Sequence, residues 1–228
     1  QEEAGRLTYI GVRHEGAASF ACSGFAKLTG LPCACLSIAG PGATNLLTGL
    51  WDAKMDRAPV LALTGQVNTQ VLGPGAFQEI DLADAFASVS AFSRTLLPDS
   101  RHAELTALAL KHAVVERGVG HLIVPDEVQV IPAAEDAGPS PPAGRLGDSG
   151  IRPADEALRE AVDRLAAARR PAVIVGYGAR ERMADVVALA ERLRAPVLTT
   201  FKAKGQIADD HPLAAGVLGR SGTPVASW

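Results

Sequence analysis

Short apolar runs alternate with longer stretches of helical periodicity along the first half of the chain. The runs are continuously apolar, whereas a strand with one wet face would alternate apolar and polar positions. Continuous runs indicate strands that are buried on both faces, and so a parallel sheet covered by helices. Strands are expected over residues 9–12, 33–38, 60–64, 94–97 and 120–124, and helices over 16–29, 43–56, 81–91 and 102–117.

A break in composition follows this part of the chain. Residues 133–150 are rich in proline and glycine and lack apolar periodicity, which is typical of a surface linker. Beyond the break, helices are expected over 153–168 and 181–193, and strands over 171–176 and 196–200. We therefore predict an α/β protein made of a parallel sheet flanked by helices over 1–133, a linker over 134–150, and a partial Rossmann-like α/β domain over 151–228.

Composition and charge exclude several classes of protein. Apolar residues make up 47% of the 228 residues and charged residues 21%, as in globular proteins of one or two domains. A net charge of −3 and an aromatic content of 4% give no basic, base-stacking surface for nucleic acid. No apolar run has the length of a membrane helix. The chain lacks an initiator Met and stops soon after an apolar run with no following partner, so we expect it to be a piece of a longer protein.

The three cysteines indicate a reducing compartment. Cys22, Cys33 and Cys35 form neither an even disulfide framework nor a C-x-x-C pair. Small buried thiols in a cytoplasmic protein are the expected state for cysteines of this kind.

A carboxylate stands where the first apolar run passes into a helical stretch. Glu15 lies at the expected start of this helix, near free backbone N–H groups and the positive end of the helix dipole. In an open parallel sheet this edge is also where ligands bind. The same position suits a plain cap or dipole partner, so position alone leaves the role of Glu15 open.

Two glycine-rich loops follow expected strands. In Gly40–Asn45 the two glycines let the backbone approach a ligand closely and Pro41 stiffens the turn, but the phosphate-loop pattern is absent. In Gly73–Glu79, Phe77 and Gln78 would project from the same edge of the sheet. Each loop, taken alone, also fits an ordinary surface turn.

These motifs share the order and spacing of a known family. Residues 13–18, 40–62, 65–67 and 77–79 resemble the pyrimidine-binding domain of thiamine diphosphate-dependent enzymes of the acetolactate synthase and pyruvate oxidase group, without its first strand and helix. Residues 175–180, 202–207 and 210–213 resemble the central domain of that group. The resemblance implies decarboxylation of a pyruvate-like 2-keto acid by a carboligase or oxidase. It further implies a homodimer or homotetramer. Composition and the cysteines, as argued above, indicate a cytoplasmic protein with no nucleic acid or membrane partner.

The resemblance also implies roles for particular residues. Glu15 would be the catalytic carboxyl group that hydrogen bonds to N1′ of the aminopyrimidine ring, so that the ring acts as a general acid–base. Pro41 and Asn45 would border that ring. Gln78, with Phe77 beside it, would reach the keto acid and the cofactor.

Mg²⁺ and the diphosphate are not accounted for by this sequence. The family holds them with a G-D-G motif and a later Asn, and Gly147-Asp148-Ser149 matches neither the motif nor its context. Carboxylate and carbonyl oxygens are needed for this cation, so the resemblance implies that a C-terminal domain outside the sequence holds the Mg²⁺.

The sequence of the second domain, over residues 151–228, leaves open whether the protein binds a flavin. By resemblance to the oxidase branch, FAD would be bordered by Gly176, Gly178, Arg180 and Lys204, although many relatives have this domain without flavin. G-x-G-x-x-G fails as a dinucleotide fingerprint because position 181 is Glu. A flavin- or nicotinamide-dependent Rossmann-type oxidoreductase is therefore an alternative with less support. A non-catalytic relative of the same fold is the other alternative.

Overall fold

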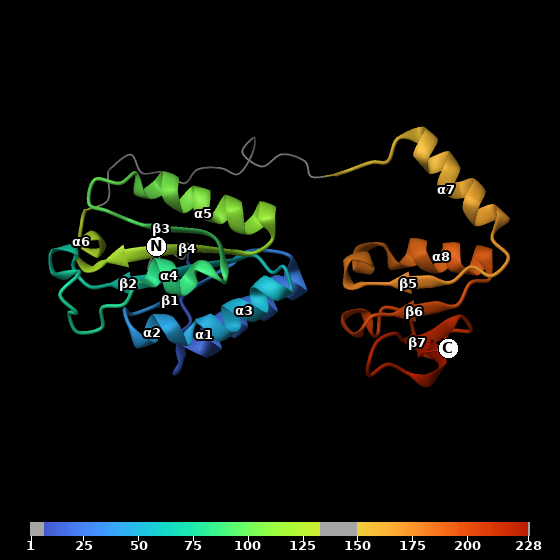
Figure 1. The fold of residues 1–228 in the computed structure, drawn as a ribbon, viewed down its shortest axis with the longest axis horizontal. Helices are drawn as coiled ribbons and strands as arrows, with labels where there is room; N and C mark the ends of the chain where they lie inside the picture. The colour runs from blue at the N-terminus through green and yellow to red at the C-terminus, as the bar shows by residue number, and fades with distance from the viewer. Residues whose placement is uncertain (1–6, 133–149, 228) are drawn as a thin grey trace. The chain divides into compact units, whose positions relative to one another are not determined.

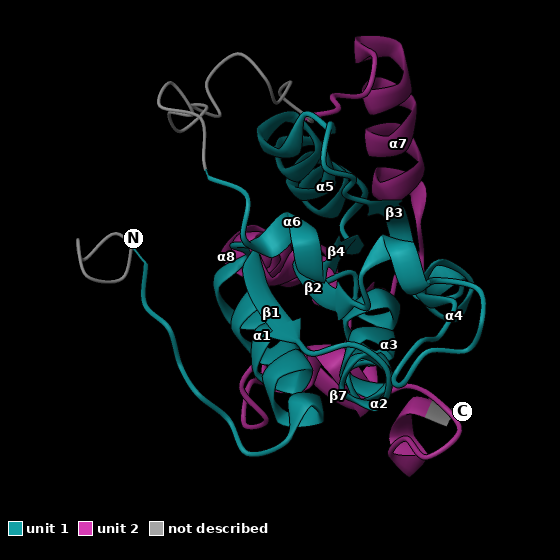
Figure 2. Ribbon diagram, turned by 90° about the vertical axis from the view of Figure 1, so that its left-hand side faces the viewer, with its two compact units in different colours: residues 1–148 teal, residues 149–228 magenta. Residues whose placement is uncertain are grey.

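The computed structural model describes residues 7–132 and 150–227. The chain forms two compact units, Gln1–Asp148 and Ser149–Trp228 (Figures 1 and 2). Each unit contains its own parallel sheet with helices, which confirms the predicted α/β class. The predicted linker over 134–150 falls almost entirely on residues 133–149, which lie outside the described residues, so its bounds stay a prediction.

Unit 1 is built on a four-stranded parallel sheet in the order β1-β2-β4-β3. Three of its strands coincide with the predicted apolar runs. The strands are β1 (Cys33–Ser37), β2 (Val60–Gln66), β3 (Ser90–Thr95) and β4 (Val119–Pro125). The helices are α1 (Glu15–Thr29), α2 (Pro41–Asn45), α3 (Leu47–Met55), α4 (Leu82–Ala87), α5 (His102–Glu116) and α6 (Asp126–Gln129), with a 3₁₀ turn η1 (Thr69–Val71).

The two faces of this sheet have separate cores. One core is formed by the four helices α1, α2, α3 and α4 together with the sheet, and it contains Leu50 and Phe86, which are fully buried. The other joins α5 and α6 with side chains such as Leu61 and Leu122 on the opposite face (Figure 1). Burial on both faces explains why β2 and β4 do not alternate apolar and polar positions.

Close packing of α5 depends on a glycine in the central strand. A Cβ built on Gly120 of β4 would collide with the backbone of Ala109 on α5. Gly120 therefore sets how near α5 lies to the sheet.

The expected strand over residues 9–12 does not form. Tyr9, Ile10 and Val12 are exposed, and the segment runs outside the sheet before it enters α1 (Figure 2). An apolar run becomes a strand only where a neighbouring strand satisfies its backbone groups. In the described sheet, residues 9–12 pair with neither of the edge strands β1 and β3, so the backbone groups of this run have no strand partner.

Three further boundaries differ from the prediction. The helix expected over 43–56 is divided at Leu46 into α2 and α3. The helix over 81–91 ends at Ala87, because β3 begins at Ser90, four residues before the predicted strand. β3 was hidden by its polar residues, of which Ser93 is hydrogen bonded to His121 on the neighbouring strand.

Unit 2 has a three-stranded parallel sheet in the order β5-β6-β7. Its core is formed mainly by α8 and the sheet, with Val197 and Ala190 fully buried. Its elements are α7 (Asp155–Ala167), β5 (Val173–Val175), η2 (Tyr177–Arg182), α8 (Met183–Leu193), β6 (Val197–Thr199), η3 (Phe201–Ala203), β7 (Ala214–Val217) and η4 (Pro224–Ser227). β7 escaped prediction because it is short and contains Gly216 at φ 87°.

Across residues 7–132 and 150–227, no helix combines the length and apolar character needed to cross a membrane.

Candidate functional site

Glu15 is the first residue of α1. His14 precedes it as the N-cap, with extended backbone angles, and its Nδ1 accepts a hydrogen bond of 3.0 Å from the N–H of Gly16. The imidazole therefore satisfies one of the free N–H groups of the first helical turn. Glu15 itself is partly buried, so its carboxylate stands at the positive end of α1 with access to solvent.

A second helix brings an amide to this carboxylate. Asn45, the last residue of α2, donates a hydrogen bond of 3.0 Å from its Nδ2 to Oε2 of Glu15. The two residues are thirty positions apart in the sequence, so packing of α2 near the start of α1 creates the pair. Pro41 opens α2 after Gly40, whose φ of 63° favours glycine.

Gly42 makes room for the carboxylate. A Cβ on Gly42 would stand 3.1 Å from Oε1 of Glu15 and 2.6 Å from Cγ2 of Ile38. A side chain at position 42 would thus push against Ile38 and crowd Glu15. The loop glycine that suggested ligand approach therefore also has a packing role within the chain.

The surroundings of Glu15 favour its charged form. Its own backbone N–H and the amide of Asn45 lower the pKa of Glu15, against a smaller opposing effect of burial. In this structure the hydrogen bonds outweigh burial, so they favour the carboxylate form of Glu15.

The second glycine-rich loop is held together by the carboxylate of Glu79. Its oxygens accept hydrogen bonds from the backbone N–H groups of Gly73 at 2.7 Å, Gly75 at 3.1 Å and Ala76 at 2.8 Å. These three donors lower the pKa of Glu79. Sequence reasoning did not single out Glu79. The sequence signal that could have identified it is a carboxylate at the end of a glycine-rich loop, where several backbone N–H groups need an acceptor.

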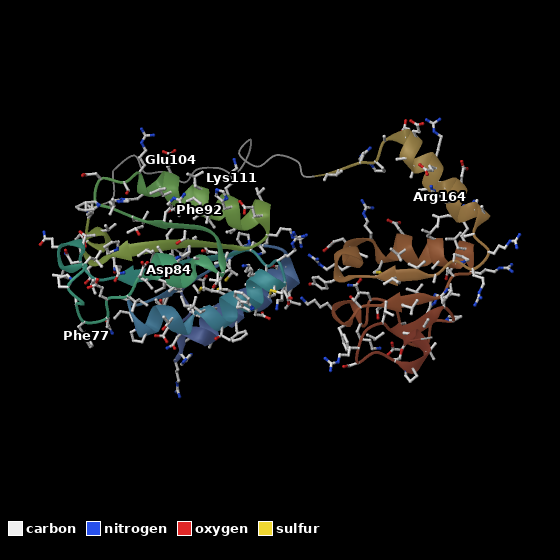
Figure 3. All side chains as sticks on the ribbon, in the orientation of Figure 1. Phe77, Asp84, Phe92, Glu104, Lys111 and Arg164 are labelled. Carbon is white, nitrogen blue, oxygen red and sulfur yellow. The ribbon has the colours of Figure 1, made fainter. Side chains whose placement is uncertain are left out.

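The two loops meet where Gln78 lies against Gly40. A Cβ on Gly40 would be 2.9 Å from both the Cβ and the backbone O of Gln78. Gln78 is itself held at φ 67°, an uncommon conformation for a residue with a side chain. Phe77 is 89% exposed and projects from the lower left of unit 1 (Figure 3). Of the residues expected to reach substrate, Gln78 is therefore tied to the Gly40–Asn45 loop, whereas Phe77 is not.

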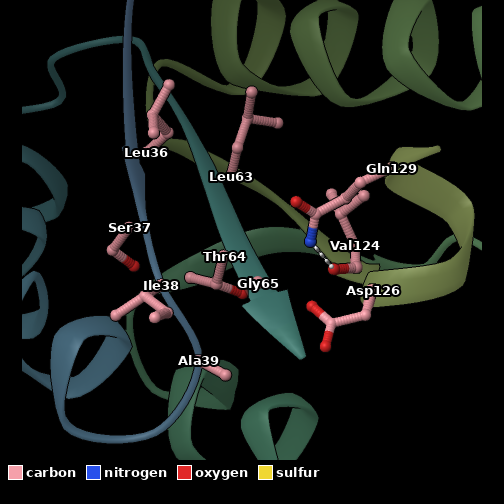
Figure 4. A pocket seen from close by; sticks show the side chains of 10 residues that line it. All are labelled: Leu36, Ser37, Ile38, Ala39, Leu63, Thr64, Gly65, Val124, Asp126 and Gln129. Carbon is pink, nitrogen blue, oxygen red and sulfur yellow. Dashed lines mark hydrogen bonds between the residues drawn. The ribbon is translucent and has the colours of Figure 1, made fainter. Parts of the chain in front are cut away.

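A pocket of about 450 Å³ lies at the carboxyl ends of β1, β2 and β4 (Figure 4). Its walls are partly apolar, with Leu36 and Leu63, and Asp126 of α6 contributes a carboxylate to the lining. Ile38 lines the pocket. It is also a neighbour of Gly42, which in turn lies beside the carboxylate of Glu15, so Ile38 and Gly42 connect the pocket to Glu15. This is the edge where ligands bind in open parallel sheets.

The candidate flavin residues lie in unit 2. Gly176 and Gly178 have open space where a Cβ would stand, and neither has a positive φ. Arg180 stacks over the ring of Tyr177, with its guanidinium carbon 4.7 Å from the centroid, and its Nε lies 3.2 Å from Glu181. Lys204 is paired with Asp209. Nothing in the fold of unit 2 therefore requires glycine at positions 176 and 178.

Neither unit offers a metal site in its described part. Residues 7–132 and 150–227 contain no group of three or more His, Cys, Asp or Glu side chains that could hold a metal ion. Gly147-Asp148-Ser149 lies outside the described residues.

Two family models match the chain. Residues 1–86 match the N-terminal TPP binding domain of thiamine pyrophosphate enzymes, and residues 158–228 match their central domain.

Relatives with curated names agree with these matches. A putative thiamine pyrophosphate-containing protein, YdaP, of Bacillus subtilis (strain 168) is 36% identical over 99% of this chain and 39% of its own length. The pyruvate oxidase of Lactiplantibacillus plantarum is 33% identical over 96% of the chain and 36% of its own length. The large subunit of acetolactate synthase isozyme 1 of Escherichia coli (strain K12) is 31% identical over 95% and 38%. The chain thus spans less than two fifths of the length of these relatives.

Proposed function

Because the chain belongs to the thiamine pyrophosphate enzymes, whose N-terminal TPP binding domain and central domain it carries, we propose that it provides the aminopyrimidine half of a thiamine diphosphate site. The longer enzyme would decarboxylate a 2-keto acid. The observation that supports this most directly is the pair of Glu15 and Asn45 at the start of α1. A carboxylate held in place by an amide suits a ring nitrogen that carries a proton.

The residues of unit 1 fit the aminopyrimidine ring. Oε1 of Glu15 faces Gly42, which has no Cβ, while Oε2 accepts the hydrogen bond from Asn45. Pro41 stands at the start of the same short helix. When bound, thiamine diphosphate supplies the electron sink that the cleavage of a carbon–carbon bond beside a keto group requires.

The chain's own residues would bind and orient. Glu15 shares a proton with N1′ of the ring, and Asn45 fixes the direction of that carboxylate. Gln78 faces the substrate from the second loop, with its backbone held against Gly40. Phe77 provides an apolar surface beside it. Mg²⁺ and the diphosphate would be held by a part of the protein outside this sequence, which in an assembly of two or more subunits can come from a partner.

FAD is a second candidate cofactor for unit 2. The open, unstrained backbone at Gly176 and Gly178 supports it, since these glycines leave room for a ligand to approach. Arg180 follows this loop in the sequence, and Lys204 follows η3. Each of the two side chains already has an acidic partner. Flavin absorbance near about 450 nm in the purified full-length protein would test this directly. The choice between carboligase and oxidase follows from that result together with product analysis.

Replacement of one carboxylate tests the proposal. In the full-length enzyme, Glu15→Gln should keep the fold and the oligomeric state but lower kcat by about 10²–10⁴-fold, because the amide cannot share the proton with N1′. Glu104→Gln, on the exposed side of α5, is the matched control and should leave kcat unchanged. Near-normal turnover of Glu15→Gln would rule out the assigned role.

Calorimetry on the 228-residue chain tests the half-site. Because the chain would hold only the aminopyrimidine half, we expect no tight binding of thiamine diphosphate, with or without Mg²⁺. Micromolar binding by this chain alone would contradict the division of the site.

A further inference from the structure

The three cysteines of unit 1 gather between α1 and β1. The Sγ atoms of Cys22, on α1, and Cys33, at the start of β1, are 3.2 Å apart. Cys35, two residues along the same face of β1, also contacts the Cys22 thiol. All three are free thiols in the structure. The three cysteines, whose spacing in the sequence predicted no disulfide, therefore form one cluster in the structure.

We propose that Cys22 and Cys33 are a site of oxidative modification, at which a small-molecule disulfide joins them in an intramolecular disulfide between α1 and β1. A disulfide bond is about 2.05 Å long, so the two sulfur atoms need to approach by only about 1 Å. Cys33 is the first residue of β1 and follows the exposed turn Gly30–Pro32, which allows this adjustment.

Access decides where the reaction begins. Cys22 and Cys35 are each 4% exposed, whereas Cys33 is only partly buried. An oxidant from solution therefore reaches Cys33 first, and Cys22 is the thiol in contact with it.

The reaction is a pair of thiol–disulfide exchanges. The thiolate of Cys33 attacks one sulfur of the oxidant, forms a mixed disulfide and releases one small thiolate. Cys22 gives up its proton to solvent, attacks Sγ of Cys33 and releases the second small thiolate. Two electrons pass from the cysteines to the oxidant, and the two protons end on the two small thiols that leave.

The surroundings make this reaction slow. Burial, together with the neighbouring Cys22 thiol, raises the pKa of Cys33 to about 11, so that thiolate is scarce at neutral pH. The pair therefore stays reduced in a reducing compartment and responds to sustained oxidation. The disulfide would fix α1, which begins at Glu15, to β1, which leads to Ile38 and the Gly40 loop.

Peptide mapping tests the proposal on the 228-residue chain. The chain is incubated with oxidised glutathione at about pH 8, where exchange is measurable, and its remaining thiols are then alkylated under denaturing conditions. Trypsin separates Cys22, in residues 14–27, from Cys33 and Cys35, in residues 28–54. We expect a cross-linked pair of these two peptides, whose mass is the sum of the two peptides less two hydrogen atoms plus the one alkyl group that Cys35 takes up.

Single substitutions identify the partner. Cys35→Ser should still form the cross-link at the wild-type yield, whereas Cys22→Ala and Cys33→Ser should lose it. Circular dichroism of each reduced variant shows that it is folded, and Cys33→Ser decides the matter if the buried Cys22→Ala does not fold. The proposal is overturned if Cys33→Ser cross-links as well as the wild type. It is equally overturned if the folded wild-type chain yields only glutathione adducts, or a disulfide within residues 28–54.

Discussion

The backbone of Gln78 lies so close to Gly40 that a Cβ at position 40 would be 2.9 Å from the Cβ of Gln78. This contact joins the two glycine-rich loops that follow different strands. One loop leads into Asn45, the partner of Glu15, and the other is closed by Glu79. The candidate site is therefore an assembly of interlocked loops, and disturbance of one loop should be felt in the other.

Gly40→Ala should destabilise unit 1 by about 1–3 kcal/mol, because the new methyl group collides with Gln78 and alanine is strained at φ 63°. Urea unfolding followed by circular dichroism measures the loss. Gly75→Ala is the matched control: its φ is also positive, at 83°, but its Cβ would meet nothing within 4 Å. The control should lose only about 1 kcal/mol from backbone strain. Equal losses would show that the contact with Gln78 does not matter.

Asn45→Ala should raise the pKa of Glu15, because the amide that stabilises the carboxylate is removed. NMR titration of the Glu15 side-chain carbonyl carbon in the 228-residue chain measures this change. Thr44→Ala removes a neighbouring hydroxyl that bonds to the backbone of Pro41, and it should leave the Glu15 titration unaltered. An unchanged titration in Asn45→Ala would mean that the hydrogen bond contributes nothing in solution.

Glu79→Gln should loosen the second loop, because a neutral amide accepts the three backbone hydrogen bonds less strongly than a carboxylate does. Hydrogen exchange at the N–H groups of Gly73, Gly75 and Ala76 should become faster, while exchange in β2 stays the same. Since the pKa of Glu79 is lowered in the fold, its contribution exists above the unfolded pKa and disappears as the pH falls through the folded one. Acid should therefore have the same effect on the wild-type loop as the substitution.

His121 makes unit 1 sensitive to moderate acid. The ring is fully buried, stacks on Phe86 with centroids 4.0 Å apart, and is hydrogen bonded at 2.9 Å by Thr64 and by Ser93. Burial lowers the pKa of His121 from 6.5 to about 3. Below pH 6.5 the unfolded chain takes up a proton that the folded chain refuses, so stability is lost as the pH falls.

The expected slope of the unfolding free energy rises from about 1 kcal/mol per pH unit near pH 6 to about 1.4 near pH 5, a range above the unfolded pKa values of carboxylates. Urea unfolding at a series of pH values measures it. His121→Gln should be less stable at neutral pH but should lose most of this slope. A variant that keeps the full slope would assign the proton to another group.

Lys27 should contribute more to the free energy of unfolding than an ordinary surface lysine does. Its Nζ lies 2.6 Å from a carboxylate oxygen of Asp52 on α3 and of Asp56, the residue that caps the end of α3, and all three side chains are at least partly buried. Lys27→Met leaves the two carboxylates without this cation and should cost about 1–3 kcal/mol. Arg101→Met, which breaks the exposed pair with Glu104, is the control and should cost less than about 1 kcal/mol. Urea unfolding in low and high salt compares the two, and equal costs would contradict the prediction.

Local sequence was enough to predict the two α/β parts, most of the strands and the helix that Glu15 begins. These features depend on the period of apolar residues and on capping and turn residues, which act over a few positions. The same local rules were wrong at residues 9–12, began β3 four residues too late and missed β7. A strand exists only if a distant segment pairs with it, and the polar residues of β3 are satisfied by a residue on another strand.

The sequence by itself determined the α/β alternation of most elements, the family to which the chain belongs and the residues worth testing, because each depends on short motifs or on the local period of apolar residues. Only the tertiary structure decided which of those residues meet. It placed Asn45 on Glu15, Gln78 on Gly40, and Cys22 beside Cys33. Such contacts join residues between 11 and 38 positions apart, since 33 − 22 = 11 and 78 − 40 = 38. They arise from the packing of helices and loops on a common sheet, which no local pattern specifies.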